Sequence, residues 1–219
     1  MLRRNIPLNY RNVTGVASSY EGKDSVEFES TLEYDFIRLL RFDDANVVDY
    51  RSQPIIKYVD SKGCNRRYTP DFLVEYKSGA KVLYEVKPRA KIRENWGELK
   101  PKFKQGIRYA KSKGWKFRLV SEVEIRTDYL KNVCFLERYK FNSTYDTRFE
   151  QLLDNLKSFE VSTPEELIAS VAHSKKAKAE LLYTLWQLVA DNVIGIDLDV
   201  PINMKSEIWC CSEDGPYEQ

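Results

Sequence analysis

The chain has 219 residues, of which 42% are hydrophobic and 31% charged, and its formal net charge is +2; this composition predicts a globular protein and excludes a disordered one. No apolar run approaches the ~20 residues that span a bilayer, and the N-terminal segment lacks the apolar stretch of a secretory signal, so we expect a soluble intracellular protein without a membrane partner. The single histidine, His173, and four cysteines without C-x-x-C spacing argue against a histidine or cysteine metal cluster. Carboxylates, lysine and metal remain as the groups for any hydrolysis.

Residues 1–24 are polar without a clear period and predict an N-terminal arm. Residues 27–40 predict a helix, because apolar residues recur at helical spacing. This apolar stripe comprises Phe28, Leu32, Phe36, Leu39 and Leu40. On the same helix, Glu33 is a candidate third acid for a metal site formed with acids farther along the chain. The alternative is local: Ser30 and Glu33 have the spacing of a capping box, although Ser30 also fits inside the helical pattern.

Residues 46–59 predict two strands separated by a break at Pro54, because proline cannot donate a hydrogen bond to a neighbouring strand. Residues 60–65 have the polar and glycine content of a turn. Arg66 and Arg67 follow this turn and enter the next strand. We expect both arginines to face phosphates if the substrate is a nucleic acid.

Residues 68–76 and 80–86 are rich in β-branched and aromatic residues and flank a short glycine-containing turn, a pattern that predicts a β-hairpin. Asp71 lies on the first strand. Glu85 and Lys87 are two residues apart at the end of the second strand, so their side chains leave the same face. Carboxylates grouped in this way can hold Mg²⁺, and a neighbouring lysine can orient or deprotonate an attacking water. The alternative is that these are solvent-facing charges of an amphipathic hairpin.

The segment from residue 87 to residue 118 carries twelve lysines and arginines and two glutamates, a net charge of +10. Residues 89–96 predict a basic loop, and residues 97–113 predict a helix that ends at Gly114. A basic segment directly after a metal site favours a polyanionic substrate such as nucleic acid. The cations of this segment that we expect to bind DNA are Arg89, Lys91, Arg93, Lys100 and Lys104. The alternative is a solvated helix face.

Residues 115–121 predict another strand, and residues 128–139 predict another helix. The polar residues that begin at Asn142 mark a candidate domain boundary. It divides the chain into a catalytic domain at residues 25–141 and a C-terminal domain at residues 142–219. The order of helix, strands, helix and strand predicts an α/β fold in which helices flank a mixed sheet.

The C-terminal domain predicts three helices, at residues 147–159, 162–172 and 175–191, followed by two short strand-like runs. This order predicts a helical, winged-helix-like module, which can bind either DNA or protein. Only the start of the third helix carries lysines, and the chain from residue 191 onward has a net charge of −6. We therefore favour protein docking, with contact to the DNA backbone as the alternative.

Pro70-Asp71, followed fourteen residues later by Glu85-x-Lys87, matches the pattern of the PD-(D/E)xK nuclease superfamily. The segments STLEYDFIRLLRFD, VVDYRSQP, TPDFLVEY and YEVKP together resemble the TnsA family of transposon-end endonucleases, over about residues 25–125. The positions that match the family's functional residues are Glu33, Asp71, Glu85 and Lys87. Some TnsA proteins have glutamine at the position of Glu85, where this chain follows the superfamily consensus.

The resemblance implies a restriction-endonuclease-like fold and a Mg²⁺-dependent DNA endonuclease, with Mn²⁺ able to substitute. It implies cleavage of the 5′, non-transferred strands at transposon ends, together with a TnsB-like DDE transposase and a TnsC-like AAA+ regulator, in the bacterial cytoplasm at the nucleoid. Asp71, Glu85 and the Val86 carbonyl would hold the metal. Glu33 would complete the site directly or through water, and Lys87 would orient or activate the attacking water. The alternatives are a stand-alone restriction-like or junction-resolving nuclease and a catalytically inactive adaptor of the same fold.

Overall fold

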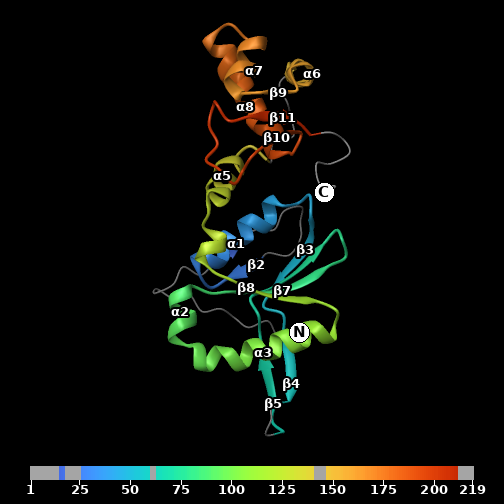
Figure 1. Ribbon diagram of the computed structural model, residues 1–219, viewed down its shortest axis with the longest axis vertical. Helices are drawn as coiled ribbons and strands as arrows, with labels where there is room; N and C mark the ends of the chain where they lie inside the picture. Colours follow the sequence, from blue (N-terminus) through green and yellow to red (C-terminus); the bar gives the residue numbers. More distant parts are fainter. Residues whose placement is uncertain (1–14, 18–25, 60–62, 141–146, 212–219) are drawn as a thin grey trace. The chain divides into compact units, whose positions relative to one another are not determined.

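The structure is a computed structural model, and its contacts divide the chain into two compact units, residues 1–126 and 127–219 (Figure 1). The residues that it describes are 15–17, 26–59, 63–140 and 147–211. The domain boundary predicted at Asn142 lies outside the described residues. The helix that the sequence placed just before that boundary, α5 (Asp128–Leu136), belongs to the second unit.

A four-stranded mixed sheet lies at the centre of the first unit (Figure 1). Its strands, in spatial order, are β3 (Val47–Ser52), β6 (Phe72–Tyr76), β7 (Lys81–Val86) and β8 (Lys116–Val120). The first three strands pair antiparallel, and β8 pairs parallel to β7. A parallel pair needs a long crossover, which here contains the helices α2 (Arg89–Glu94) and α3 (Trp96–Ser112). The predicted hairpin of β6 and β7 is confirmed, but its first strand begins at Phe72 rather than at residue 68, so that Tyr68 belongs to β5 (Asn65–Tyr68) and Asp71 lies between β5 and β6.

Helix α1 (Thr31–Phe42) begins four residues later than the periodicity predicted, so that prediction is wrong for its first turn. Ser30 is the N-cap, and its Oγ accepts a hydrogen bond from the Glu33 N–H at 3.2 Å. The residues before it form β2 (Val26–Phe28), which pairs antiparallel with β1 (Gly15–Ala17). The buried apolar residues of this strand continue the spacing of the apolar stripe of α1, so the sequence pattern predicted one more turn of helix there.

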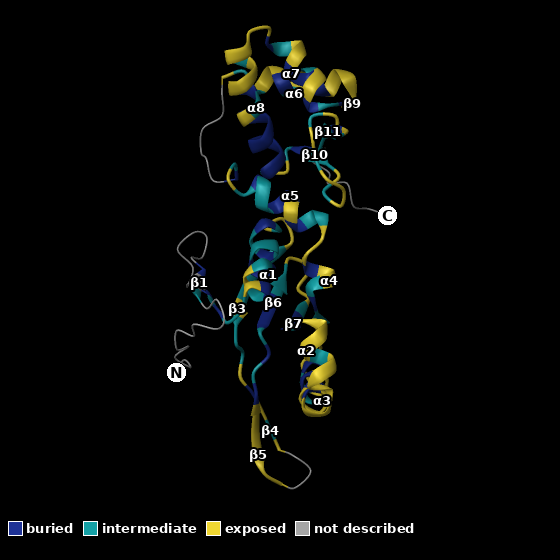
Figure 2. Ribbon diagram, turned by 90° about the vertical axis from the view of Figure 1, so that its left-hand side faces the viewer, coloured by how far each residue is buried: buried dark blue, intermediate teal, exposed yellow. Residues whose placement is uncertain are grey.

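Helices cover both faces of β6 and β7. On one face, the ring of Phe36 in α1 packs against Phe72 and Tyr84, with ring centroids 5.4 and 4.9 Å apart. The buried cluster on the other face, under α3, includes Leu73, Leu83, Leu99 and Phe103. Figure 2 shows β6 and β7 largely in dark blue, the colour of buried residues. Strands buried on both faces read as nearly continuous apolar runs, as these two do.

The crossover contains one confirmed and one wrong prediction. Helix α3 ends as expected: Gly114 has φ +72°, a left-handed conformation that glycine adopts without strain. The loop predicted at residues 89–96 is instead the helix α2. None of the residues of α2 is buried, so its sequence carries no apolar period by which a helix could have been recognised.

Strands β4 (Ile56–Val59) and β5 (Asn65–Tyr68) form a separate antiparallel ribbon of two strands. The ribbon extends beyond the four-stranded sheet in both views (Figures 1 and 2). The break predicted at Pro54 is confirmed, because the chain leaves β3 at Gln53, whose φ is +51°. From the end of β5, two residues lead the chain directly to Asp71.

In its described part, the second unit combines helices with a three-stranded antiparallel sheet. The helices are α5, α6 (Phe149–Phe159), α7 (Pro164–Val171) and α8 (Lys175–Ala190), and the strands, in spatial order, are β10 (Ile194–Ile196), β11 (Ile208–Cys210) and β9 (Val161–Ser162). The three helices and two strand-like runs predicted here are confirmed, and the winged-helix assignment stays a prediction. None of the helices in the described ranges has both the length and the apolar character needed to cross a bilayer.

Asn132 of α5 holds the loop that connects β10 to β11. Its Nδ2 donates to the carbonyls of Leu198 and Val200 at 2.8 and 2.7 Å, and its Oδ1 accepts from the Ile202 N–H at 3.3 Å. Asn132 is 5% exposed, so water has little access to these groups. The amide therefore replaces water for three backbone groups of a loop that has no regular structure of its own.

Asn132→Ala tests this role. The substitution leaves buried polar groups without partners, so we expect it to lower the free energy of unfolding by about 1–3 kcal/mol, measured by chemical denaturation. Asn155→Ala is the matched control, because Asn155 donates at the surface, to Ser170 Oγ at 2.8 Å. We expect the control to change stability by less than about 0.5 kcal/mol. Equal effects of the two substitutions would contradict the role given to Asn132.

Candidate active site

Asp71 lies where the chain passes from β5 into β6. Its Oδ2 accepts a hydrogen bond from the Val86 N–H at 2.7 Å, and its own carbonyl accepts from the Gln53 N–H at 2.8 Å. The pair of bonds fixes Asp71 against the end of β7 on one side and the end of β3 on the other. The residue as a whole is partly buried.

Glu85 is the buried acid of the site, with 4% of its surface exposed. Lys87 Nζ lies 2.8 Å from its Oε1, as expected for side chains two residues apart on one strand face. The hydroxyl of Tyr68 donates to Oε2 at 2.6 Å. Each carboxylate oxygen therefore has one strong partner, which offsets the cost of burying the charge.

Tyr68 was not predicted as a site residue. In the sequence it reads as one more aromatic residue of a strand, and nothing local indicates that its hydroxyl reaches a carboxylate seventeen residues away. Burial raises the pKa of the Tyr68 phenol, and so do the charge of Glu85 and the hydrogen bond to it. The phenol stays protonated and can act as a donor to Glu85.

Glu33 occupies the third position of α1, and both of its oxygens take part in the cap of the helix. Oε1 accepts from Ser30 Oγ at 2.9 Å, and Oε2 accepts from the Glu29 N–H at 2.8 Å. The capping alternative is therefore correct for the local contacts, although the backbone donor is Glu29 rather than Ser30 as in the usual box. The same contacts fix the direction in which the carboxylate of Glu33 points. Burial raises the pKa of Glu33 above its usual value, which the two hydrogen bonds partly counter.

The charges of Glu33, Asp71, Glu85 and Lys87 act on one another. Desolvation raises the pKa of Asp71 well above its usual value, and the charges of Glu85 and Glu33 add to this rise, while Lys87 and the Val86 N–H oppose it. Burial alone would lower the pKa of Lys87, but the charges of Asp71 and Glu85 outweigh it and raise that pKa. Contacts thus join Asp71, Glu85 and Lys87 at the start of β6 and the end of β7, and Glu33 of α1 acts on them through its charge. Acids outnumber the one ammonium group, which favours the binding of a cation.

The donor set fits a hard divalent cation, because carboxylate and carbonyl oxygens are the ligands that Mg²⁺ prefers. Among the residues that the structure describes, however, no three acidic, cysteine or histidine side chains stand together as a ready-made metal cluster. Lys87 and Tyr68 engage Glu85, and the cap of α1 engages Glu33. The carboxylates would have to exchange some of these hydrogen bonds for metal contacts. Val86 already takes part in the site through its N–H.

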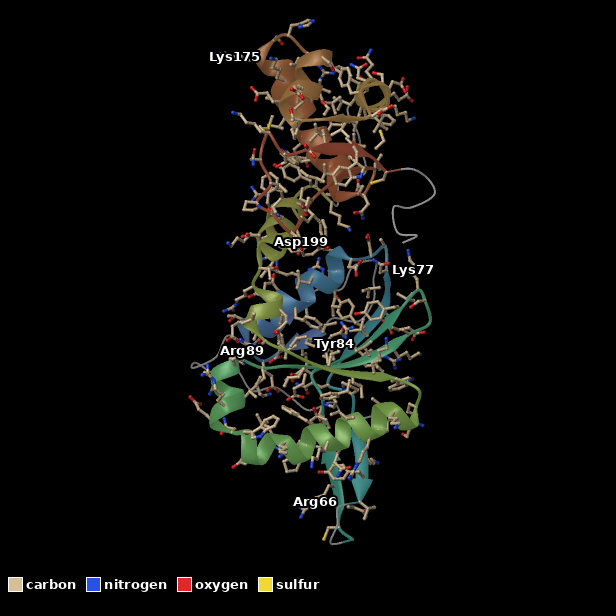
Figure 3. All side chains as sticks on the ribbon, in the orientation of Figure 1. Arg66, Lys77, Tyr84, Arg89, Lys175 and Asp199 are labelled. Atoms are coloured by element: carbon tan, nitrogen blue, oxygen red, sulfur yellow. The ribbon has the colours of Figure 1, made fainter. Side chains whose placement is uncertain are left out.

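The cations predicted to bind DNA lie on three different elements. All of them are exposed: Arg66 and Arg67 on β5, Arg89, Lys91 and Arg93 on α2, and Lys100 and Lys104 on α3. Figure 3 labels Arg66 on the ribbon and Arg89 at the start of α2. The backbone N–H of Arg89 donates to Glu122 Oε2 at 2.9 Å, which joins α2 to α4 (Glu122–Ile125). Lys100 Nζ lies 6.0 Å from the ring centroid of Trp96.

Two family models match the chain. The model described as "TnsA-like endonuclease N terminal" matches residues 44–122, and the one described as "TnsA endonuclease C terminal" matches residues 124–198. No match to an individual curated protein was found. Asp71, Glu85 and Lys87 lie inside the first matched region and Glu33 precedes it, and the two regions meet close to the division between the compact units. The mixed sheet with its flanking helices is a restriction-endonuclease-like fold, and the chain belongs to the TnsA endonuclease family.

Proposed function

We propose that this protein is a metal-dependent DNA endonuclease that cleaves the 5′, non-transferred strands at transposon ends. It would act together with a DDE transposase, which joins the 3′ ends, and with an AAA+ regulator. Membership of the TnsA family supports an endonuclease that acts on DNA within a transposition complex. The observation that carries the catalytic part is the convergence of Asp71, Glu85 and Lys87, with Glu33 within electrostatic reach.

The residues that would hold Mg²⁺ or Mn²⁺ are Asp71, Glu85, Glu33 and the carbonyl of Val86. Such a cation lowers the pKa of a water molecule and stabilises negative charge on a leaving oxygen. Asp71 is the first ligand of the proposal, because its carboxylate is held beside Val86, whose carbonyl belongs to the same set of ligands. Its Oδ2 is held by the Val86 N–H, which orients the other oxygen of the carboxylate.

Lys87 supplies positive charge beside the carboxylates. Its Nζ is held by Glu85, so the ammonium group has a fixed place rather than a free surface position. From there it can donate a hydrogen bond to an attacking water, or to the phosphate oxygens as they gain negative charge. Glu85 thus has two roles in the proposal, as a metal ligand and as the residue that positions Lys87.

The second unit fits protein docking better than reading of a DNA groove. Lys175, Lys176 and Lys178 are exposed at the start of α8, but every residue from Thr184 to Ala190 is buried. A recognition helix needs an exposed face along the part that enters the groove. The proposal therefore assigns this unit to contact with the transposase or the regulator.

The two rival functions give different results in a nicking assay on plasmid DNA with Mg²⁺ or Mn²⁺. A stand-alone nuclease of this fold would cut DNA without the transposase, and an inactive adaptor would not cut DNA in any mixture. We expect the chain alone to produce almost no cleavage, and to cut at transposon ends when the transposase and regulator are present.

Asp71→Ala removes the first metal ligand of the proposal. We expect at least about a hundredfold loss of 5′-strand cleavage, the scale seen when one group that stabilises the transition state is removed, while 3′ joining by the transposase continues. The measurement is end cleavage and strand transfer in the complete mixture with Mg²⁺. Asp44→Ala is the control, because Asp44 is an exposed acid of the first unit that is not among the proposed metal ligands. Loss of both reactions, or of neither, would contradict the assignment.

Tyr68→Phe removes only the hydroxyl that donates to Glu85. A hydrogen bond to a charged group contributes about 1.5 kcal/mol or more, so we expect about a tenfold slower cleavage and a shift of the Mn²⁺ dependence to higher concentration. DNA affinity should not change. Tyr76→Phe is the matched control, since its hydroxyl bonds to Tyr84 at 2.8 Å without contact to an acid of the site. An unchanged metal dependence of Tyr68→Phe would show that its hydroxyl does not position Glu85.

A further inference from the structure

The ribbon of β4 and β5 has two chemically different faces. Partners across an antiparallel pair share a face, and residues alternate between faces along each strand. One face carries Ile56 and Tyr68, which pair with each other and are 1% and 5% exposed. Both belong to the buried cluster under α3, and Tyr58 packs against the same cluster. This inner face anchors the ribbon to the first unit.

The outer face is exposed and carries opposed positive charges. Lys57 pairs with Arg67, and Val59 pairs with Asn65; all four residues are exposed. Within the described residues, neither Lys57 nor Arg67 has an ion-pair partner. Like charges directly opposite each other destabilise a strand pair, so the ribbon alone gains nothing from this arrangement. A polyanion that binds across both side chains would remove the repulsion and gain two contacts.

The ribbon also leads directly to the proposed active site. Tyr68, the last residue of β5, bonds to Glu85, and Asp71 follows three residues later. From Tyr68 to Asn65 the strand covers three residue steps, about 10 Å at ~3.3 Å per residue. This length corresponds to about three base pairs of duplex DNA, which rises 3.4 Å per nucleotide of one strand. The strand that carries Arg67 and Asn65 on its outer face therefore ends at the catalytic groups, and its length matches several neighbouring phosphates.

We propose that the outer face of the β4–β5 ribbon binds the phosphate backbone of duplex DNA next to the scissile phosphate. The inference rests on the proposed nuclease function and says where its substrate lies. Lys57, which the sequence did not single out, and Arg67 are the contacting cations. The exposed cations of α3 form the competing surface for the duplex, because the buried side of α3 packs in the same cluster as the inner face of the ribbon.

The test measures the affinity of the full chain for a duplex oligonucleotide at several salt concentrations, with a chelator present so that no cleavage occurs. Each phosphate contact contributes about 0.9 to the slope of log affinity against log salt. Lys57→Ala combined with Arg67→Ala should reduce the magnitude of this negative slope by about 1.8. The affinity deficit against wild type should then be about twelvefold larger at 50 mM than at 200 mM salt, which is fourfold raised to the power of 1.8.

Two matched double variants complete the design. Lys77→Ala with Lys205→Ala removes the same number of exposed charges elsewhere, and we expect it to leave the slope unchanged. Lys100→Ala with Lys104→Ala tests α3. The ribbon variant should melt no lower than wild type, because it relieves the repulsion between the paired cations; a lower melting temperature would contradict the energetic argument.

Three outcomes would overturn the proposal: no wild-type binding at 50 mM salt, an unchanged slope in the ribbon variant, or an equal change in the ribbon and Lys77/Lys205 variants. A slope change confined to the α3 variant would place the duplex on α3 instead. Because binding is measured without metal, the result is separate from the Asp71→Ala cleavage test. Normal cleavage by Asp71→Ala refutes the catalytic assignment alone, and an unchanged slope refutes the ribbon alone.

Discussion

The carboxylate of Glu85 lies in the interior of the first unit, where an ionised group is stable only if its oxygens are paired. Tyr68 from β5 and Lys87 from the end of β7 supply those partners, at 2.6 and 2.8 Å. The contacts among these three residues therefore join β5, β7 and the start of the crossover at one place in the structure. Asp71 joins the same point through the Val86 N–H. Loss of this arrangement would separate the acids from the lysine.

The rest of the unit keeps that point in place. Strands β6 and β7 are packed on one face by the aromatic contacts of α1 and on the other by the cluster under α3, so the hairpin that carries the acids cannot shift without disturbing both layers. The cap of α1 fixes Glu33, whose charge acts on Asp71. Glu33 and Glu85 thus lie on a helix and a strand, and Asp71, between two strands, is held by hydrogen bonds to Val86 and Gln53, which favours a precise metal site once a cation is present.

Much of this site could be predicted from local rules. A spacing of two along a strand puts Glu85 and Lys87 on one face, and the glycine-containing turn identifies the hairpin. Contacts that depend on strand register or on the meeting of distant segments could not be read in this way: Tyr68 reaches Glu85, and Lys57 faces Arg67, only because of how the strands pair. Helix α2 was missed because none of its residues is buried, and the start of α1 was misplaced because a buried strand imitated its period.

The proposed nuclease activity requires that the acids of this site bind a divalent cation beside Lys87. Anomalous diffraction from crystals of the full chain grown with Mn²⁺ tests it directly. We predict one strong manganese peak in contact with carboxylate oxygens of both Asp71 and Glu85, with the ammonium group of Lys87 beside it. A peak bound to only one of these acids, or crystals saturated with Mn²⁺ that show no peak at this position, would contradict it.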